Sequence, residues 1–238
     1  MPLTPEQEWT LVACGLVAHA DGVLKEGECD QVLAMLDERL SPTDQEQWVA
    51  LLASREALLR HVDELPPILP LFHEALLERA WAMVLADGEI GESERKVVDE
   101  IATMLGADLN DLKSWIEGWT REAVALAEHK ASFAALLIHR DGTIDDAEAI
   151  RFNALIDQMP VSHDQRDKMR ELLHDPPTLD HVGARLAALP REKRVEILRA
   201  IAPLVSASQN EAVGREFFLD LCGHAGIEPI ASERMLDL

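Results

Sequence analysis

The chain has 238 residues, 47% of them hydrophobic and 28% charged, which suits a folded protein of one or two domains and excludes a disordered one. Its formal net charge of −22 excludes nucleic-acid binding driven by phosphate contacts, because such binding depends on Lys and Arg displacing counterions. The same charge suits a divalent cation or a basic protein partner, or simply keeps the protein in solution.

Cysteine usage and the N-terminus bear on the compartment. Cys14, Cys29 and Cys222 have neither metal-finger nor redox-motif spacing, so we expect small core residues in a reducing compartment, the cytoplasm. The N-terminus lacks a basic region followed by an apolar run, so no secretory signal is expected. No stretch reaches the roughly 18 uncharged apolar residues that a transmembrane segment needs.

The hydrophobic periodicity of the first half predicts helices throughout. Leu11, Val12 and Leu16 recur at helical spacing, and Pro42 and Gly106 are typical of a helix start and a helix end. The predicted helices cover 5–20, 26–39, a segment opening at 42, a long segment ending near 86 after a proline-rich bend at 66–70, then 92–105 and about 109–118.

The second half repeats this order, with predicted helices near 122–139, 146–158, 162–173, 191–205 and 211–224. No strand-like alternation of useful length occurs. We therefore expect an all-α protein with two tandem domains, residues 1–118 and 119–238, joined near 118–122 by a nearly continuous helical connection.

One motif, Asp-Gly-x-(Ile/Leu)-x-x-x-Glu, occurs at 21–28, 87–94 and 141–148. A fourth copy is expected near residue 207, where the chain reads Ala207-Ser208. The starting positions lie 66, 54 and 66 residues apart, which gives a period of 120 with two related halves in each copy. At that shift HVDELPPILP falls on HVGARLAALP without a gap, so the sequence predicts a duplication.

A structural interpretation explains every residue of the motif. Glycine supplies the positive φ of a tight turn, and aspartate bonds to backbone amides within it. Leu24, Ile90 and Ile144 are expected to point back into the core. The glutamate then lies in the first turn of the next helix, where it can complete a capping box, as for Asp145 with Glu148.

A metal-linked interpretation begins with the calcium loop of an EF-hand, whose second half the motif matches. The first half does not match, because non-acidic residues stand where the earliest ligands belong: Val17, His19, Met83, Leu85, Leu137 and His139. A standard EF-hand is therefore not expected. Another geometry stays open, in which the paired turns gather carboxylates that a cation or protons must compensate, with His19 and His139 as further ligands.

Residues 80–106, AWAMVLADGEIGESERKVVDEIATMLG, and residues 17–36, VAHADGVLKEGECDQVLAML, resemble the TerB-like family associated with tellurite resistance. The resemblance covers 5–118 well and 122–238 less well. It implies two tandem bundles of about 6–7 helices and a role in stress or phage response within larger assemblies near the membrane. It also implies a metal at the acidic turns, on Asp21, Glu28, Asp87, Glu94, Asp141 and Glu148.

No catalytic motif is present: the chain has no nucleophile elbow, glycine-rich phosphate loop or HExxH. We therefore expect a non-enzymatic module that binds a divalent cation (calcium or zinc), a protein partner (basic, or in a membrane-associated assembly), or both. The alternative is a purely structural interaction scaffold without a metal. Because the fourth turn is degenerate, any paired acidic site is expected in the first domain.

Tryptophans suggest two further features. His73, Leu77 and Trp81 recur at helical spacing and are expected to pack in the core. Trp115 and Trp119 lie near the predicted domain junction, where we expect them to hold the two domains together; anchoring a partner is the alternative.

Overall fold

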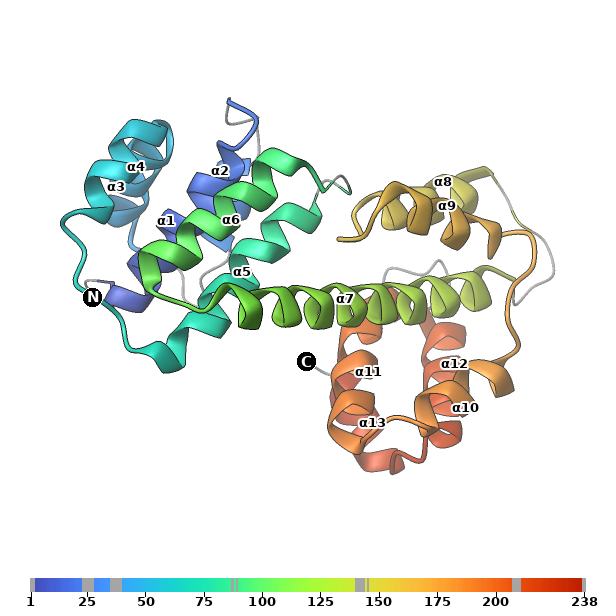
Figure 1. The fold of residues 1–238 in the computed structure, drawn as a ribbon. Coiled ribbons are helices and arrows are strands. Elements are labelled where there is room, and N and C mark those ends of the chain that lie inside the picture. The colour runs from blue at the N-terminus through green and yellow to red at the C-terminus, as the bar shows by residue number, and fades with distance from the viewer. Residues whose placement is uncertain are drawn as a thin grey trace. The chain divides into compact units, whose positions relative to one another are not determined.

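The computed structural model describes residues 3–22, 28–34, 40–86, 88, 90–139, 144, 146–206 and 211–236 (Figure 1). Every regular element in these ranges is a helix, which confirms the all-α prediction. Within the same ranges, no helix is both long and apolar enough to cross a bilayer.

The chain divides into two compact units. The first unit comprises residues 1–122 and 160–162, and the second comprises 123–159 and 163–238. The division into domains at 118/119 and their tandem relationship stay predictions. The helix α7 runs without a break over Leu109–Ile138, so the expected helical connection is one continuous helix whose two ends belong to different units.

The described residues of the first unit form seven helical elements before α7. They are α1 (Pro5–Ala18), α2 (Glu28–Ala34), α3 (Pro42–Leu52), α4 (Arg55–Val62), the 3₁₀ turn η1 (Pro70–Phe72), α5 (His73–Ala86) and α6 (Glu92–Leu105).

Helix α1 forms the centre of this unit. Every residue from Trp9 to Val17 is buried, as expected of a helix that is apolar on most of its circumference. Its neighbours are α5, α4, α6 and α2. A reciprocal capping box begins the helix: the amide of Gln7 donates to the Thr4 hydroxyl, and the amide of Thr4 donates to the Gln7 side chain.

Helix α5 buries the face that the sequence predicted, with His73 6%, Leu77 0% and Trp81 1% exposed. The Trp81 indole Nε1 donates to the Thr120 hydroxyl at 2.9 Å, which links α5 to α7. Trp115 and Trp119, one turn apart on α7, are half-buried and contact each other, with ring centroids 6.1 Å apart. Their predicted role in holding two domains together stays a prediction.

The second unit contains α8 (Asp146–Asp157), α9 (His163–Glu171), α10 (Leu179–Ala187), α11 (Arg191–Ser206), α12 (Glu211–His224) and α13 (Pro229–Leu236). Its largest apolar cluster joins Phe133 and Leu136 of α7 to residues of α10, α11, α12 and α13. Phe133 packs edge-to-face on Phe218 of α12, with ring centroids 6.0 Å apart.

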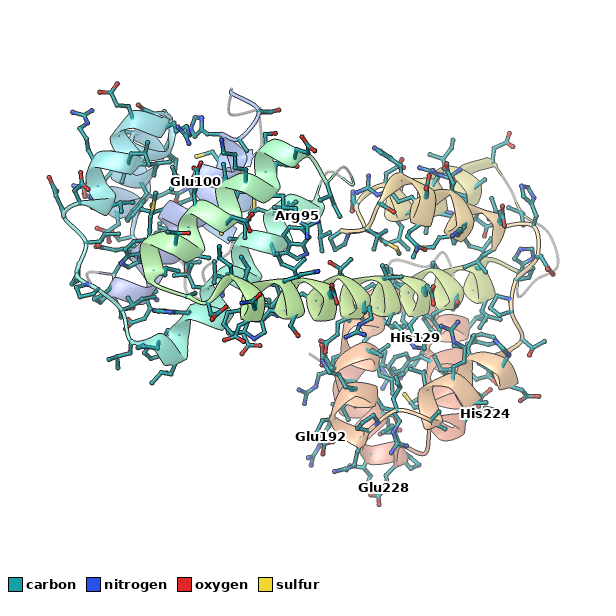
Figure 2. All side chains as sticks on the ribbon, viewed as in Figure 1. Arg95, Glu100, His129, Glu192, His224 and Glu228 are labelled. Atoms are coloured by element: carbon teal, nitrogen blue, oxygen red, sulfur yellow. The ribbon has the colours of Figure 1, made fainter. Side chains whose placement is uncertain are left out.

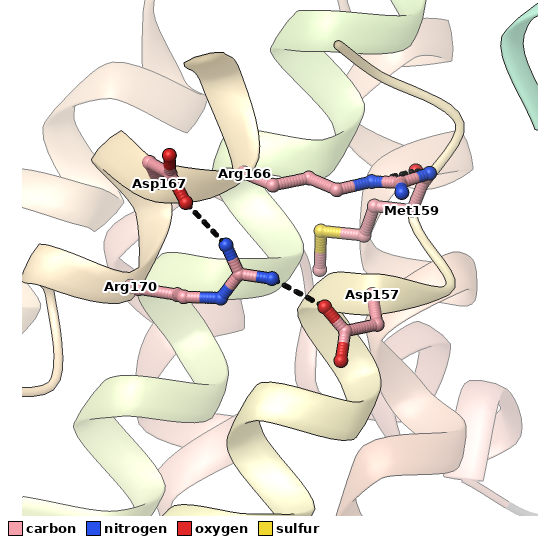
Figure 3. A network of polar contacts seen from close by, with 5 residues as sticks. All are labelled: Asp157, Met159, Arg166, Asp167 and Arg170. Carbon is pink, nitrogen blue, oxygen red and sulfur yellow. Dashed lines mark hydrogen bonds and ion pairs between the residues drawn. The ribbon is translucent and has the colours of Figure 1, made fainter. Parts of the chain in front are cut away.

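The α8–α9 turn depends on a buried arginine (Figure 3). Arg166 is only 5% exposed, and its Nε and one terminal nitrogen donate to the Met159 carbonyl at 3.1 and 2.7 Å. One helical turn later, the more exposed Arg170 pairs with Asp157 and Asp167. The buried contact positions the turn, whereas an exposed ion pair of this kind contributes little to stability.

Candidate functional site

The first Asp-Gly turn closes α1. Asp21 is exposed, and Gly22 has φ +103, the left-handed conformation that the motif predicts for its glycine. The Gly22 amide donates to the His19 carbonyl at 3.1 Å, which ends the helix. Glu28 is the first residue of α2, but its side chain lies outside the described residues, as does Leu24.

The second turn, between α5 and α6, repeats this geometry at its glycine. Gly88 has φ +85, and its amide donates to the Leu85 carbonyl at 3.3 Å. Asp87 lies outside the described residues. Glu94 is half-buried, and its Oε2 accepts a hydrogen bond from the Gly91 amide at 2.9 Å. Glu94 therefore caps α6, which is the structural role that the sequence predicted for this position of the motif.

Part of the structural interpretation is wrong. Ile90 is 43% exposed and Ile144 is 38% exposed, so neither side chain is driven into the core. For Ile90 the reason is local: it precedes the first residue of α6, outside the buried stripe that Val97, Val98 and Ile101 form. In the second and third copies the apolar residue of the motif therefore does not fill the interior.

The third turn is described only in part. Asp141 and Asp145 lie outside the described residues, so the predicted capping box of Asp145 with Glu148 is not tested. Glu148 is half-buried in the first turn of α8. A negative side chain there complements the positive end of the helix whether or not a cation is bound.

The histidines two residues before the first and third aspartates have structural partners. His19, 7% exposed, has Nε2 2.7 Å from the Leu52 carbonyl, and His139 has Nε2 2.8 Å from the Leu173 carbonyl. A carbonyl can only accept, so each Nε2 carries the proton and donates. That nitrogen therefore cannot ligate a metal, whereas Nδ1 of each ring keeps its lone pair, so the contacts give both histidines a structural partner without deciding on a metal.

The described side chains do not assemble a metal centre. Of the four first-domain ligand candidates, only Asp21 and Glu94 have described side chains. In the described parts of the chain, no three His, Cys, Asp or Glu side chains come together in a way that could hold an ion.

The cysteines are not poised for nucleophilic chemistry. Burial raises the pKa of the Cys14 thiol to about 12 and that of Cys222 to about 11, and burial also raises the pKa of Cys29. The reactive form of a cysteine is the thiolate, so these thiols stay protonated and unreactive near neutral pH.

The sequence did not indicate that two polar side chains, Arg166 and His129, are buried. Arg166 belongs to no motif, and the partner of its guanidinium is a backbone carbonyl. His129 on α7 (Figure 2) is 4% exposed, and its pKa is lowered to about 4, first by burial and then by the Arg185 guanidinium. A single histidine in an apolar helical pattern gives no sequence signal for such a shift.

The comparisons with known proteins agree with the first half of the fold. Residues 7–115 match the family described as Tellurite resistance protein TerB. This range contains both complete motifs of the first unit, 21–28 and 87–94, so this part of the chain is similar to that family. No curated protein and no solved structure matches the chain.

The capping role of Glu94 can be tested with two substitutions. Glu94→Ala removes the acceptor of the Gly91 amide and is expected to cost about 0.5–2 kcal/mol of unfolding free energy. Glu94→Gln keeps an acceptor and is expected to stay within about 0.5 kcal/mol of the wild type. Urea unfolding in the presence of EDTA measures both. Equal destabilisation by the two substitutions would show that the charge, and not the cap, is what α6 needs.

Proposed function

We propose that this chain is a non-enzymatic TerB-like module of a tellurite-resistance-type stress-response system, acting in the cytoplasm by binding a divalent cation, a protein partner, or both. The observation that carries the proposal is the family match over residues 7–115, which spans both acidic turns, 21–28 and 87–94.

For the cation, the proposed ligands are Asp21, Glu28, Asp87 and Glu94 in the first unit. Carboxylate oxygens are the ligands that calcium, magnesium and manganese prefer, whereas zinc favours histidine and cysteine. The four proposed positions carry only carboxylates, which supports calcium over zinc at this place. Asp141 and Glu148 form a weaker candidate, because the turn that would pair with theirs reads Ala207-Ser208.

For the protein partner, the support is the charge of −22 together with large apolar side chains at the surface of the first unit, among them Leu69, Leu71 and Met104. Exposed apolar residues within an acidic surface suit a partner that is apolar and basic.

We also propose that the second unit is a second TerB-like bundle produced by duplication. Gly106 ends α6 with φ +74, and Gly226, 120 residues later, follows α12 with φ +70. The hydrogen bonds of His19 and His139 reach carbonyls 33 and 34 residues further along the chain. These equivalent local contacts support a common ancestry of the two halves.

Calorimetric titration of the intact chain with calcium, magnesium, manganese and zinc tests the cation. We expect saturable heat with at least one ion, and its loss in the variant Asp87→Asn with Glu94→Gln. The glutamine keeps the α6 cap, so the melting temperature of the variant in EDTA is expected to stay close to that of the wild type. No heat and no thermal shift with any of the four ions would eliminate the cation.

The same variant separates the binding module from a purely structural scaffold. If the turns only shape the fold, the variant lowers the melting temperature in EDTA and the wild type gives no heat with any ion. Loss of the heat with an unchanged melting temperature would count against the scaffold.

A further inference from the structure

A second feature of the first unit lies away from the acidic turns. The segment between α4 and α5 exposes three large apolar side chains, which we call the apolar patch: Leu69 is 60% exposed, Leu71 71% and Phe72 37%. Exposed Pro66, Pro67 and Pro70 extend it. Single exposed apolar residues need no explanation, but a contiguous group on one short segment is typical of an interaction site.

The patch is held in place by the fold. The Trp9 indole Nε1 donates to the Pro66 carbonyl at 3.0 Å, and Ile68 is buried with 9% exposure. The Phe72 amide donates to the Leu69 carbonyl at 2.9 Å, which closes the 3₁₀ turn. Prolines further restrict the backbone. A partner that docks here therefore meets a surface that is already ordered, and little conformational entropy is lost on binding.

The corresponding turn of the second unit indicates that the patch is not required by the fold. At a shift of 120 residues, Leu71 and Phe72 fall on Arg191 and Glu192, both exposed (Glu192 in Figure 2). There Pro190 directly precedes α11, so Arg191 and Glu192 lie in the first turn of an α-helix, whereas Leu71 and Phe72 lie in the 3₁₀ turn before α5. The chain thus starts the corresponding long helix with charged residues after the proline, so the start of this helix does not demand apolar ones.

The charges that flank the patch along the chain are mostly negative. Between Arg60 and Arg79 the chain has no Lys or Arg, and Asp63, Glu64, Glu74 and Glu78 are all exposed. An anionic lipid surface would be repelled by these carboxylates. A second copy docked by the same patch about a two-fold axis would bring like charges together. A partner with an apolar face flanked by Lys or Arg can contact the apolar patch and also attract the neighbouring carboxylates.

We propose that the apolar patch docks an amphipathic, basic segment of another protein, with Leu69, Leu71 and Phe72 contacting its apolar face and the surrounding carboxylates its Lys and Arg side chains. This inference rests on the partner half of the proposed function and assigns that half a surface and a partner chemistry. It does not depend on a cation at the acidic turns.

The test uses the intact chain and a synthetic helical peptide of about 18 residues composed of leucine and lysine, followed by fluorescence anisotropy. We expect saturable one-to-one binding in the micromolar range. The double variant Leu71→Arg with Phe72→Glu introduces the residues of the second unit, and its added charges cancel. The net charge of the protein, and with it the nonspecific attraction for a cationic peptide, is therefore preserved. If the peptide docks on the apolar patch, its affinity for the variant is expected to be at least about tenfold lower than for the wild type.

Three controls make the outcome specific. Ile230→Gln removes an exposed apolar side chain of the second unit and is expected to leave the affinity unchanged. Asp87→Asn with Glu94→Gln is also expected to keep peptide binding, so that failure of the cation proposal and failure of this one are distinguishable. Circular dichroism establishes that each variant is folded.

Equal affinity of the patch variant and the wild type would show that charge alone attracts the peptide and would overturn the proposal. Absence of saturable binding to the wild type would overturn it as well. Binding to phosphatidylglycerol vesicles, or a dimer in sedimentation that the patch variant abolishes, would assign the patch to a membrane or to a second copy instead.

Discussion

Trp81→Ala is expected to lower the free energy of unfolding by about 3–5 kcal/mol, because it empties a fully buried site in the first unit. The indole is 1% exposed, and its Nε1 donates to Thr120 at 2.9 Å. The substitution removes the largest side chain that α5 buries and leaves the Thr120 hydroxyl without this donor. Urea unfolding followed by far-ultraviolet circular dichroism measures the loss.

Trp81→Phe separates the two contributions. It retains an aromatic ring but has no N–H, so the expected cost is smaller, of the order of the hydrogen bond and the lost ring volume, about 1–2 kcal/mol. If the two substitutions lower the free energy of unfolding equally, the hydrogen bond to Thr120, and not burial of the ring, holds α5 against α7. A loss below about 1 kcal/mol for alanine would contradict the packing of α5 altogether.

Protonation of His129 is expected to destabilise the fold by up to about 3 kcal/mol in acid. Its pKa is about 4 in the folded chain, against an ordinary value of 6.5. Above pH 6.5 both states hold the neutral ring, and the group has no effect. Between pH 6.5 and 4 the unfolded chain binds a proton that the folded chain does not, so stability falls by about 1.4 kcal/mol per pH unit.

The variant His129→Gln isolates this effect. Carboxylates titrate in the same range, but they contribute equally to wild type and variant, so the difference between the two free energies is the quantity to measure. Near the ring, the Arg185 guanidinium lowers the pKa and Glu128 raises it, and these two side chains pair at 2.8 Å. Unfolding free energies at pH 4, 5, 6 and 7 should show the variant losing less than the wild type as pH falls. Parallel curves would contradict the lowered pKa.

The helices could be predicted wherever a local signal marks their ends. Gly106 ends α6 with the left-handed conformation expected of a C-terminal glycine, and Pro42 begins α3. Residues 42–62 show the limit of such signals. Ser54 caps α4 by accepting from the Ala57 amide at 3.3 Å, and the break between α3 and α4 gave no glycine or proline to reveal it. Helices α10 and α13 were likewise not anticipated.

In the candidate site, features set by neighbouring residues could be predicted, whereas contacts between residues far apart in the sequence could not. The turn glycines and the capping role of Glu94 follow from residues a few positions apart, and sequence reasoning found them. The partners of His19 and His139 lie more than thirty residues away, and nothing local announces a carbonyl acceptor. The direction of Ile90 was predicted wrongly, because its exposure depends on where the buried stripe of α6 begins.

The apolar patch could not be predicted from the sequence alone. A proline-rich bend next to apolar residues indicates only a turn. Its meaning depends on exposure: Ile68 is buried whereas Leu69 and Leu71, its near neighbours, are exposed. Alternation of this kind on a short irregular segment has no periodicity from which to derive which side chains face solvent.

The proposed cation site requires that the two acidic turns of the first unit form one ligand site. Crystals of the intact chain grown with manganese test it most directly, because the anomalous signal of the metal locates it without assumptions about the ligands. The account predicts a peak between the turns at 21–28 and 87–94, with carboxylate oxygens of Asp21, Glu28, Asp87 or Glu94 within about 2–2.6 Å. Ordered turns with no peak between them, in crystals that bind manganese elsewhere or not at all, would contradict it.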